Sequence, residues 1–154
     1  MELDKYYQRT ALLCVAGLAG ILILLPIYLF VVPSIRSGGA EPSVVLRAFF
    51  LGAGLVIALA LPLLRKWMMT DKFPFGDHEM HHIPHPLRGL VRTSIVTSAF
   101  CEMIALLGLV HAFLGGSGMD FYLLWGGALV LSGIYFPRKS AWREKVSPND
   151  RIIE

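Results

Sequence analysis

Four long apolar runs, separated by polar segments or by segments rich in glycine and proline, make up most of the sequence. They cover about residues 10–32, 44–64, 93–114 and 120–136. A helix rises about 1.5 Å per residue, so crossing a hydrocarbon core of about 30 Å takes about 20 apolar residues. The pattern therefore predicts an all-α, polytopic membrane protein with four transmembrane helices arranged as two antiparallel hairpins.

The breaks between the runs predict how the helices connect. Proline, glycine and serine are dense over residues 33–43, which predicts a loop. The loop Gly115–Gly118 is so short that the third and fourth spans must be antiparallel neighbours. The fourth span is expected to begin near Asp120, with that residue as its N-cap.

The start of the chain allows two interpretations. Lys5 and Arg9 precede the first run, as basic residues do in a signal peptide, and small residues at 38–40 resemble a cleavage site. The run is much longer than the apolar core of a signal peptide, however. We therefore expect a retained first span, with Pro26 as a kink, and a cleaved leader is the alternative.

The composition agrees with the membrane class and changes little else. Hydrophobic residues make up 55% of the chain and charged residues 16%, with a mean hydropathy of +0.61. The net charge of +3 does not indicate nucleic acid, because the basic residues bracket the apolar runs. Cys14 and Cys101 lie inside apolar runs, where they are expected to act as small hydrophobes. The expected partner is the lipid bilayer.

The distribution of lysine and arginine predicts the topology. Basic residues concentrate in the N-terminus, in residues 65–92 and in the tail 140–154, whereas the other two loops hold only Arg36. By the positive-inside rule, both termini and the loop 65–92 are cytoplasmic, most simply at a bacterial inner membrane. Residues 1–139 then form one four-helix membrane domain, followed by a cytoplasmic tail.

Glu102 is the carboxylate of the third span, ten residues beyond Arg92. That spacing corresponds to roughly 15 Å, which places Glu102 near the bilayer midplane, where an ionisable group is costly and commonly functional. Ser98 precedes it by four residues and so shares its helix face. Burial there would favour the neutral acid, as a reversible proton site requires. We predict proton binding at Glu102 and Ser98, with a structural hydrogen bond between helices as the alternative.

Small residues extend the same region of the third span in both directions. Side chains of this size let helices approach closely, so we expect this surface to pack against another helix. The residues concerned are Ser94, Ala105, Gly108 and Ala112. His111 is half a helical rotation from Glu102 and is expected at the membrane interface.

The run Ala99–Glu102 followed by Gly108–Val110 is similar to the carboxylate-bearing helix of the rotary ATP synthase c subunit. That resemblance covers about twenty residues and implies that Glu102 binds and releases a proton, on a helix that runs outward from a cytoplasmic loop. The family's glycine-repeat helix and its Arg-Gln-Pro loop are absent, since the second span offers only Gly52 and Gly54. The resemblance therefore implies a proton-binding helix and not a rotor ring.

The overall layout also resembles small four-helix inner-membrane proteins of bacteria. The likeness includes the start of the fourth span at Asp120–Tyr122 and its end at Tyr135–Arg138. It implies an architecture and no activity.

A histidine cluster in the loop 65–92 is the second candidate for chemistry. The run His78, Glu79, Met80, His81, His82 contains the HExxH pattern, in which a helix presents two zinc ligands and a glutamate base. Three interpretations stay open: a metalloprotease site, binding of zinc or another divalent metal by His78 and His82 with His81 or His85, and a solvated loop near lipid headgroups. The prolines around the cluster leave at most two helical turns, which disfavours the first.

Together these features predict a non-enzymatic integral membrane subunit or interaction protein, associated with a membrane-protein partner or with a second copy of itself. The alternatives are a proton- or cation-handling component that uses Glu102, and metal binding through residues 78–85. No cofactor is predicted apart from such a metal.

Overall fold

The structure is a computed structural model that describes residues 2–35, 43–70 and 85–143. These residues form helices and contain no strand, which confirms the all-α class. The helices are α1 (Glu2–Phe30), the short α2 (Val32–Ile35), α3 (Val44–Met68), α4 (His85–Phe113) and α5 (Gly118–Ile134).

Three helical segments are long and apolar enough to cross a membrane, namely Leu3–Ile35, Val44–Met68 and Leu87–Phe113. The helix α5 has 17 residues, a length of about 25 Å against a hydrocarbon core of about 30 Å. A fourth membrane span therefore stays a prediction.

Two helices extend beyond the apolar runs that predicted them. The helix α1 begins at Glu2 and α4 at His85, whereas the apolar runs begin near residues 10 and 93. Pro86 does not prevent the early start of α4, because the missing N–H of a proline costs nothing in the first turn of a helix. The helix α1 also continues past Pro26 to Phe30. The apolar runs therefore mark only part of each of these two helices.

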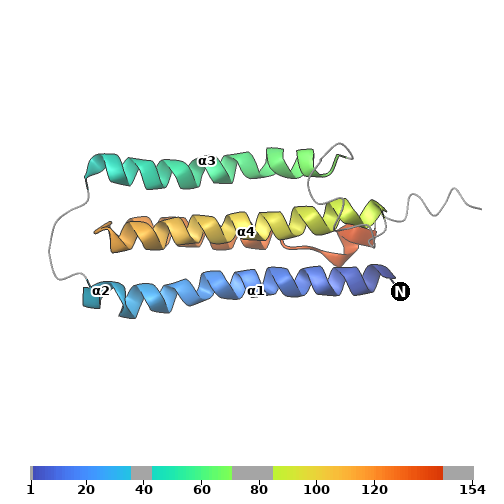
Figure 1. Cartoon of the computed structure of the whole chain (residues 1–154), viewed down its shortest axis with the longest axis horizontal. Helices are drawn as coiled ribbons and strands as arrows, with labels where there is room; N and C mark the ends of the chain where they lie inside the picture. Colours follow the sequence, from blue (N-terminus) through green and yellow to red (C-terminus); the bar gives the residue numbers. More distant parts are fainter. Residues whose placement is uncertain (1, 36–42, 71–84, 144–154) are drawn as a thin grey trace, which may run out of the picture.

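The helix α4 lies at the centre of the bundle (Figure 1). It contacts α1, α3 and α5, whereas the described residues of α1 and α3 do not contact each other. Successive long helices run in opposite directions. The starts of α1 and α4 and the ends of α3 and α5 therefore lie at one end of the bundle, which holds every described lysine and arginine except Arg47. We call this the basic end, and the other the opposite end.

The core lies where α4 meets its neighbours. Its fully buried members include Ile21, Leu61, Cys101, Ala105 and Phe121. A smaller cluster at the basic end packs Trp142 against Leu87, Leu90 and Val91. Trp142 follows α5 in the chain, is only 3% exposed, and has its ring centroid 5.5 Å from that of Tyr7.

The outer surfaces of α1 and α3 are apolar and exposed. Only 17% of the most apolar stretch of each helix is buried inside the protein. Large side chains such as Leu12, Phe30, Leu59 and Leu63 point outward. An exposed apolar surface of this extent suits contact with lipid.

Candidate functional site

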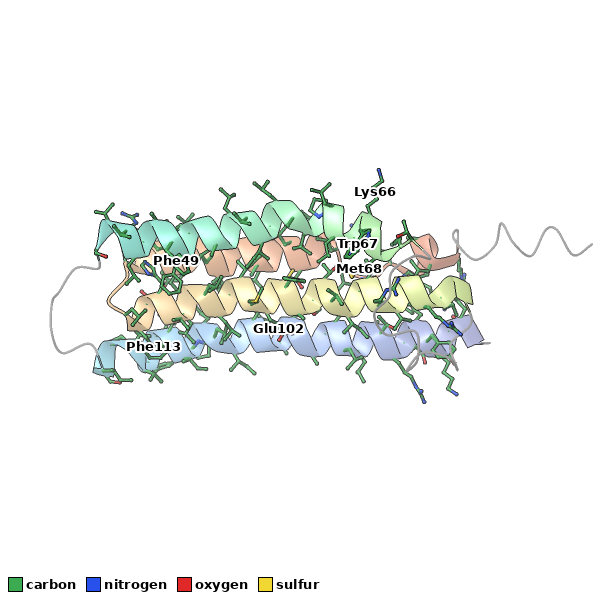
Figure 2. The ribbon with its side chains drawn as sticks, turned by 45° about the horizontal axis from the view of Figure 1, so that its top comes forward. Phe49, Lys66, Trp67, Met68, Glu102 and Phe113 are labelled. Carbon is green, nitrogen blue, oxygen red and sulfur yellow. The ribbon has the colours of Figure 1, made fainter. Side chains whose placement is uncertain are left out.

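Glu102 lies on the side of α4 that faces α1 (Figure 2). Its side chain is half-buried and rests over a glycine of α1. A Cβ atom added to Gly17 would lie 2.3 Å from Glu102 Oε1, and one added to Gly20 would lie 4.0 Å from Glu102 Oε2. The carboxyl group therefore occupies a notch that exists only because α1 carries no side chain at Gly17.

Ser98 lies over the same notch. A Cβ atom on Gly17 would lie 2.4 Å from Ser98 Oγ, so the hydroxyl and the Glu102 carboxyl converge on one point of α1. Within the described residues, Glu102 has no hydrogen bond and no ion pair. The two residues that were predicted to share a face do meet at one site, and the described part of that site supplies no cation.

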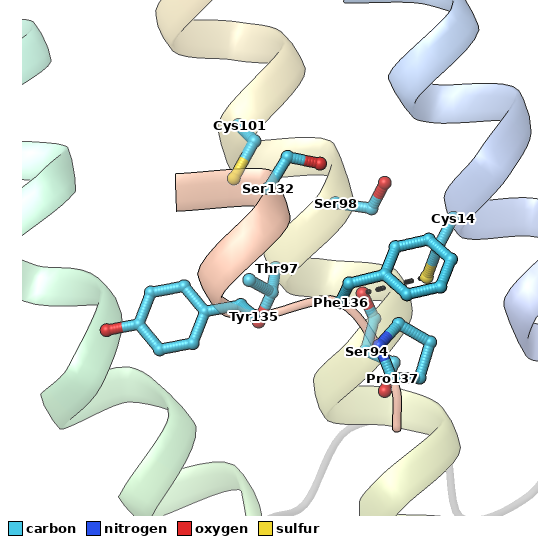
Figure 3. A pocket seen from close by; sticks show the side chains of 9 residues that line it. All are labelled: Cys14, Ser94, Thr97, Ser98, Cys101, Ser132, Tyr135, Phe136 and Pro137. Carbon is cyan, nitrogen blue, oxygen red and sulfur yellow. Dashed lines mark hydrogen bonds between the residues drawn. The ribbon is translucent and has the colours of Figure 1, made fainter. Parts of the chain in front are cut away.

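A small cavity borders Ser98, and Figure 3 shows the side chains that line it. Its volume of about 10 Å³ is close to the space that one water molecule needs, about 10–15 Å³. Polar groups from three helices surround it: Cys14 from α1, Ser94, Thr97, Ser98 and Cys101 from α4, and Ser132 from α5. Ser98 is the residue that this cavity shares with the Glu102 notch.

The other small residues of α4 are used inside the chain. Ser94, Ala105, Gly108 and Ala112 are all buried. The carbonyl of Ser94 accepts a hydrogen bond from the Cys14 thiol at 3.7 Å, which joins α4 to α1. Gly108 lies against α5, where an added Cβ would be 3.0 Å from Leu124 Cβ. The surface predicted to pack helices thus faces two neighbours within the same chain.

The opposite end holds a charged cluster that sequence analysis did not predict. Asp120, which is fully buried, accepts hydrogen bonds at Oδ1 from Arg47 Nε at 3.2 Å and Nη2 at 2.9 Å. His111 Nε2 lies 3.3 Å from Asp120 Oδ2. His111 Nδ1 is buried without a hydrogen-bond partner among the described residues. We call these three residues the Arg47–Asp120–His111 cluster.

His111 is fully buried inside the protein against Phe50, with ring centroids 5.2 Å apart, and its location at the depth of the membrane interface stays a prediction. One expectation about this end was wrong. Ser117, not Asp120, is the N-cap of α5, and its hydroxyl accepts a hydrogen bond from the Asp120 N–H. The sequence signals for this cluster were Arg47 early in α3 and His111 late in α4. Neither signal predicts that these two residues both lie beside Asp120.

The histidine cluster lies mostly outside the described residues. This applies to His78, Glu79, His81 and His82, while His85 is the first residue of α4. In the part of the chain that the structure describes, no three histidine, cysteine, aspartate or glutamate side chains are grouped as metal ligands would be. Metal binding through residues 78–85 stays a prediction.

Comparisons of this chain with models of protein families, with curated proteins and with solved structures find no match.

Proposed function

We propose that this chain is a non-enzymatic integral membrane protein that binds and releases a proton, or handles another cation, at Glu102. The observation that carries the proposal is the position of the carboxyl group in the Gly17 notch, beside Ser98 and without an ion-pair partner among the described residues. An unpaired carboxylate that is half-buried between two apolar helices of a membrane protein is costly, and binding a proton removes that cost.

The polar groups beside Glu102 provide a route for its proton. The Ser98 hydroxyl can both donate and accept a hydrogen bond, and it faces both the Glu102 notch and the small cavity. A water molecule in that cavity would reach the hydroxyl from the basic end. We propose that protons exchange with Glu102 through Ser98 on this side.

The orientation in the membrane belongs to the same proposal. The described basic residues other than Arg47 gather at the basic end. This distribution supports a cytoplasmic location for both termini and for the loop 65–92, most simply at a bacterial inner membrane.

Reaction with a hydrophobic carbodiimide tests the proton site. Carbodiimides react with protonated carboxyl groups in apolar surroundings, so we expect covalent labelling of Glu102 in the membrane-embedded protein and none in Glu102→Gln. Asp120→Asn is the matched control, because Asp120 is already paired with Arg47 and His111, and it should leave the label unchanged. Mass spectrometry of the modified peptide gives the readout. Absence of label on Glu102 across pH 5–9, or equal loss in both variants, would contradict proton binding.

A second prediction concerns the glycine notch. Gly17→Ala places a methyl group where Glu102 Oε1 and Ser98 Oγ now lie. Because both atoms are at the ends of flexible side chains, we expect stability to change by less than about 1 kcal/mol but the labelling rate of Glu102 to change severalfold. Gly52→Ala is the control, since an added Cβ meets nothing within 4 Å there. The measurement compares labelling rates and melting temperatures, and identical rates in the two variants would refute the role of the notch.

A role as an interaction subunit is the second candidate. One face of α4 stays exposed between α1 and α3 and carries large apolar side chains: Ile95, Met103, Leu106, Val110 and Phe113. A helix of a membrane-protein partner, or of a second copy, would cover this face. Wild-type behaviour of Glu102→Gln in the cell would favour this role over proton handling.

A further inference from the structure

A large cavity lies at the basic end, where α5 stops short of its neighbours. The helix α5 ends at Ile134, while α3 and α4 continue alongside. The space left over has a volume of about 400 Å³, which falls in the range of pockets that hold small organic molecules, about 300–1,000 Å³. Its walls come from the end of α3, the start of α4 and the segment after α5.

Two arginines line this cavity, and neither has a carboxylate partner among the described residues. Arg65 is half-buried; its Nη1 donates a hydrogen bond to Thr97 Oγ1 at 3.2 Å, and its Cζ lies 4.6 Å from the centre of the Tyr135 ring. These contacts fix the guanidinium in place but leave most of its five N–H donors for a ligand. Arg138 is exposed at the rim. By contrast, Lys139 nearby is paired with Asp4 at 2.5 Å.

Apart from Ser94, the remaining walls are apolar or aromatic. They include Met69, Leu90, Ile134, Phe136 and Trp142. A fixed guanidinium fork selects phosphate or carboxylate, and the apolar walls add space for part of a hydrocarbon chain. Arg65 lies in the last turn of α3, at one end of a helix that is long and apolar enough to cross a membrane. Basic pockets between transmembrane helices on the cytoplasmic side bind lipid headgroups.

We propose that this cavity binds the phosphate headgroup of an acidic phospholipid, with Arg65 as the principal contact and Arg138 at the rim. The phosphate oxygens accept hydrogen bonds from the Arg65 guanidinium, and the adjoining acyl segment lies along Met69, Leu90 and Ile134. This site is distinct from Glu102 and does not depend on its proton chemistry.

Native mass spectrometry of the full chain in mild detergent, titrated with phosphatidylglycerol, tests this site. The matched pair is Arg65→Gln and Lys66→Gln, since each removes one charge at the same depth while Lys66 is exposed and points away from the bundle (Figure 2). We expect binding about tenfold weaker in Arg65→Gln, the loss of a charged hydrogen bond, and unchanged binding in Lys66→Gln. Phosphatidylcholine, which is zwitterionic, and inorganic phosphate alone should bind far more weakly.

Other outcomes would overturn the proposal. Equal weakening in the two variants would indicate diffuse attraction to the basic end, and equal binding of phosphatidylcholine would indicate a non-selective surface. Binding of inorganic phosphate as tight as that of the lipid would assign the site to a soluble phosphate compound. If Arg65→Gln does not fold, Arg138→Gln takes its place, with about threefold weaker binding expected from the loss of a more exposed contact, and unchanged binding in that variant would also overturn the proposal.

Discussion

Arg47→Gln is expected to lower the free energy of unfolding by about 3 kcal/mol, because it leaves a buried carboxylate without its cation. Asp120 is fully buried and Arg47 supplies both hydrogen bonds to its Oδ1. With the guanidinium gone, only His111 and the N-cap Ser117 remain near the acid. The measurement is unfolding by sodium dodecyl sulfate in mixed micelles, followed by circular dichroism.

Substitution of the partner residue, Asp120→Asn, should lower the free energy of unfolding by less than Arg47→Gln does. This difference between the two variants is the more discriminating part of the prediction. Asp120→Asn keeps the shape of the side chain, and the Arg47 side chain, which is 52% exposed, can turn toward water or headgroups. We expect a loss of about 1–2 kcal/mol for this variant. The double variant should then be less destabilised than the sum of the two, since the two residues interact directly. Additive losses, or a larger loss in Asp120→Asn, would show that the ion pair does not hold the opposite end together.

Much of the helical framework follows from the apolar runs and their lengths. Each long helix contains the core of an apolar run, because the hydrocarbon environment selects about 20 apolar residues whatever the partners are. The positions of helix ends do not follow in this way. The early starts of α1 and α4 lie in polar sequence, where tertiary packing such as that of Trp142 on Leu87 and Leu90 stabilises the helix.

In the candidate site, too, one part follows from the sequence and another part depends on how the helices pack. Ser98 and Glu102 share a face because they are four residues apart on one helix, and this much is local geometry. The opposing Gly17 lies on α1, so its place depends on how α1 packs on α4. The Arg47–Asp120–His111 cluster draws one residue from each of three helices. The spacing of residues within one helix does not predict a contact among three helices. In the sequence, Arg47 is only a charged residue inside an apolar run.

The Glu102 site and the Arg47–Asp120–His111 cluster both depend on the central position of α4. Its Glu102 faces α1, and its His111 meets residues brought by α3 and α5. The small residues of α4 permit these close approaches, so their size is a requirement for both sites and not only for packing. A bulky residue in place of a small one on α4 should therefore disturb a neighbouring site as well as its own packing contact.

Gly108→Leu provides the direct test, with an expected loss of about 3 kcal/mol from overpacking between α4 and α5. An added Cβ would already lie 3.0 Å from Leu124 Cβ and 3.4 Å from the Phe121 carbonyl oxygen, before any of the longer side chain is placed. Neither atom can move away without shifting α5 itself. Since Phe121 follows Asp120 directly, such a shift should also lengthen the contact between Asp120 and Arg47.

The control is Gly126→Leu on α5, where an added Cβ meets nothing within 4 Å. Both variants add the same side chain to a helical glycine, so helix propensity rises equally and any difference in stability reports packing. Unfolding in mixed micelles should separate the two by at least about 2 kcal/mol. In Gly108→Leu, a further Arg47→Gln substitution should cost less than in the wild type, because the displaced Asp120 has already lost part of that contact. Equal stability of the two leucine variants would mean that α4 and α5 are not closely packed at Gly108.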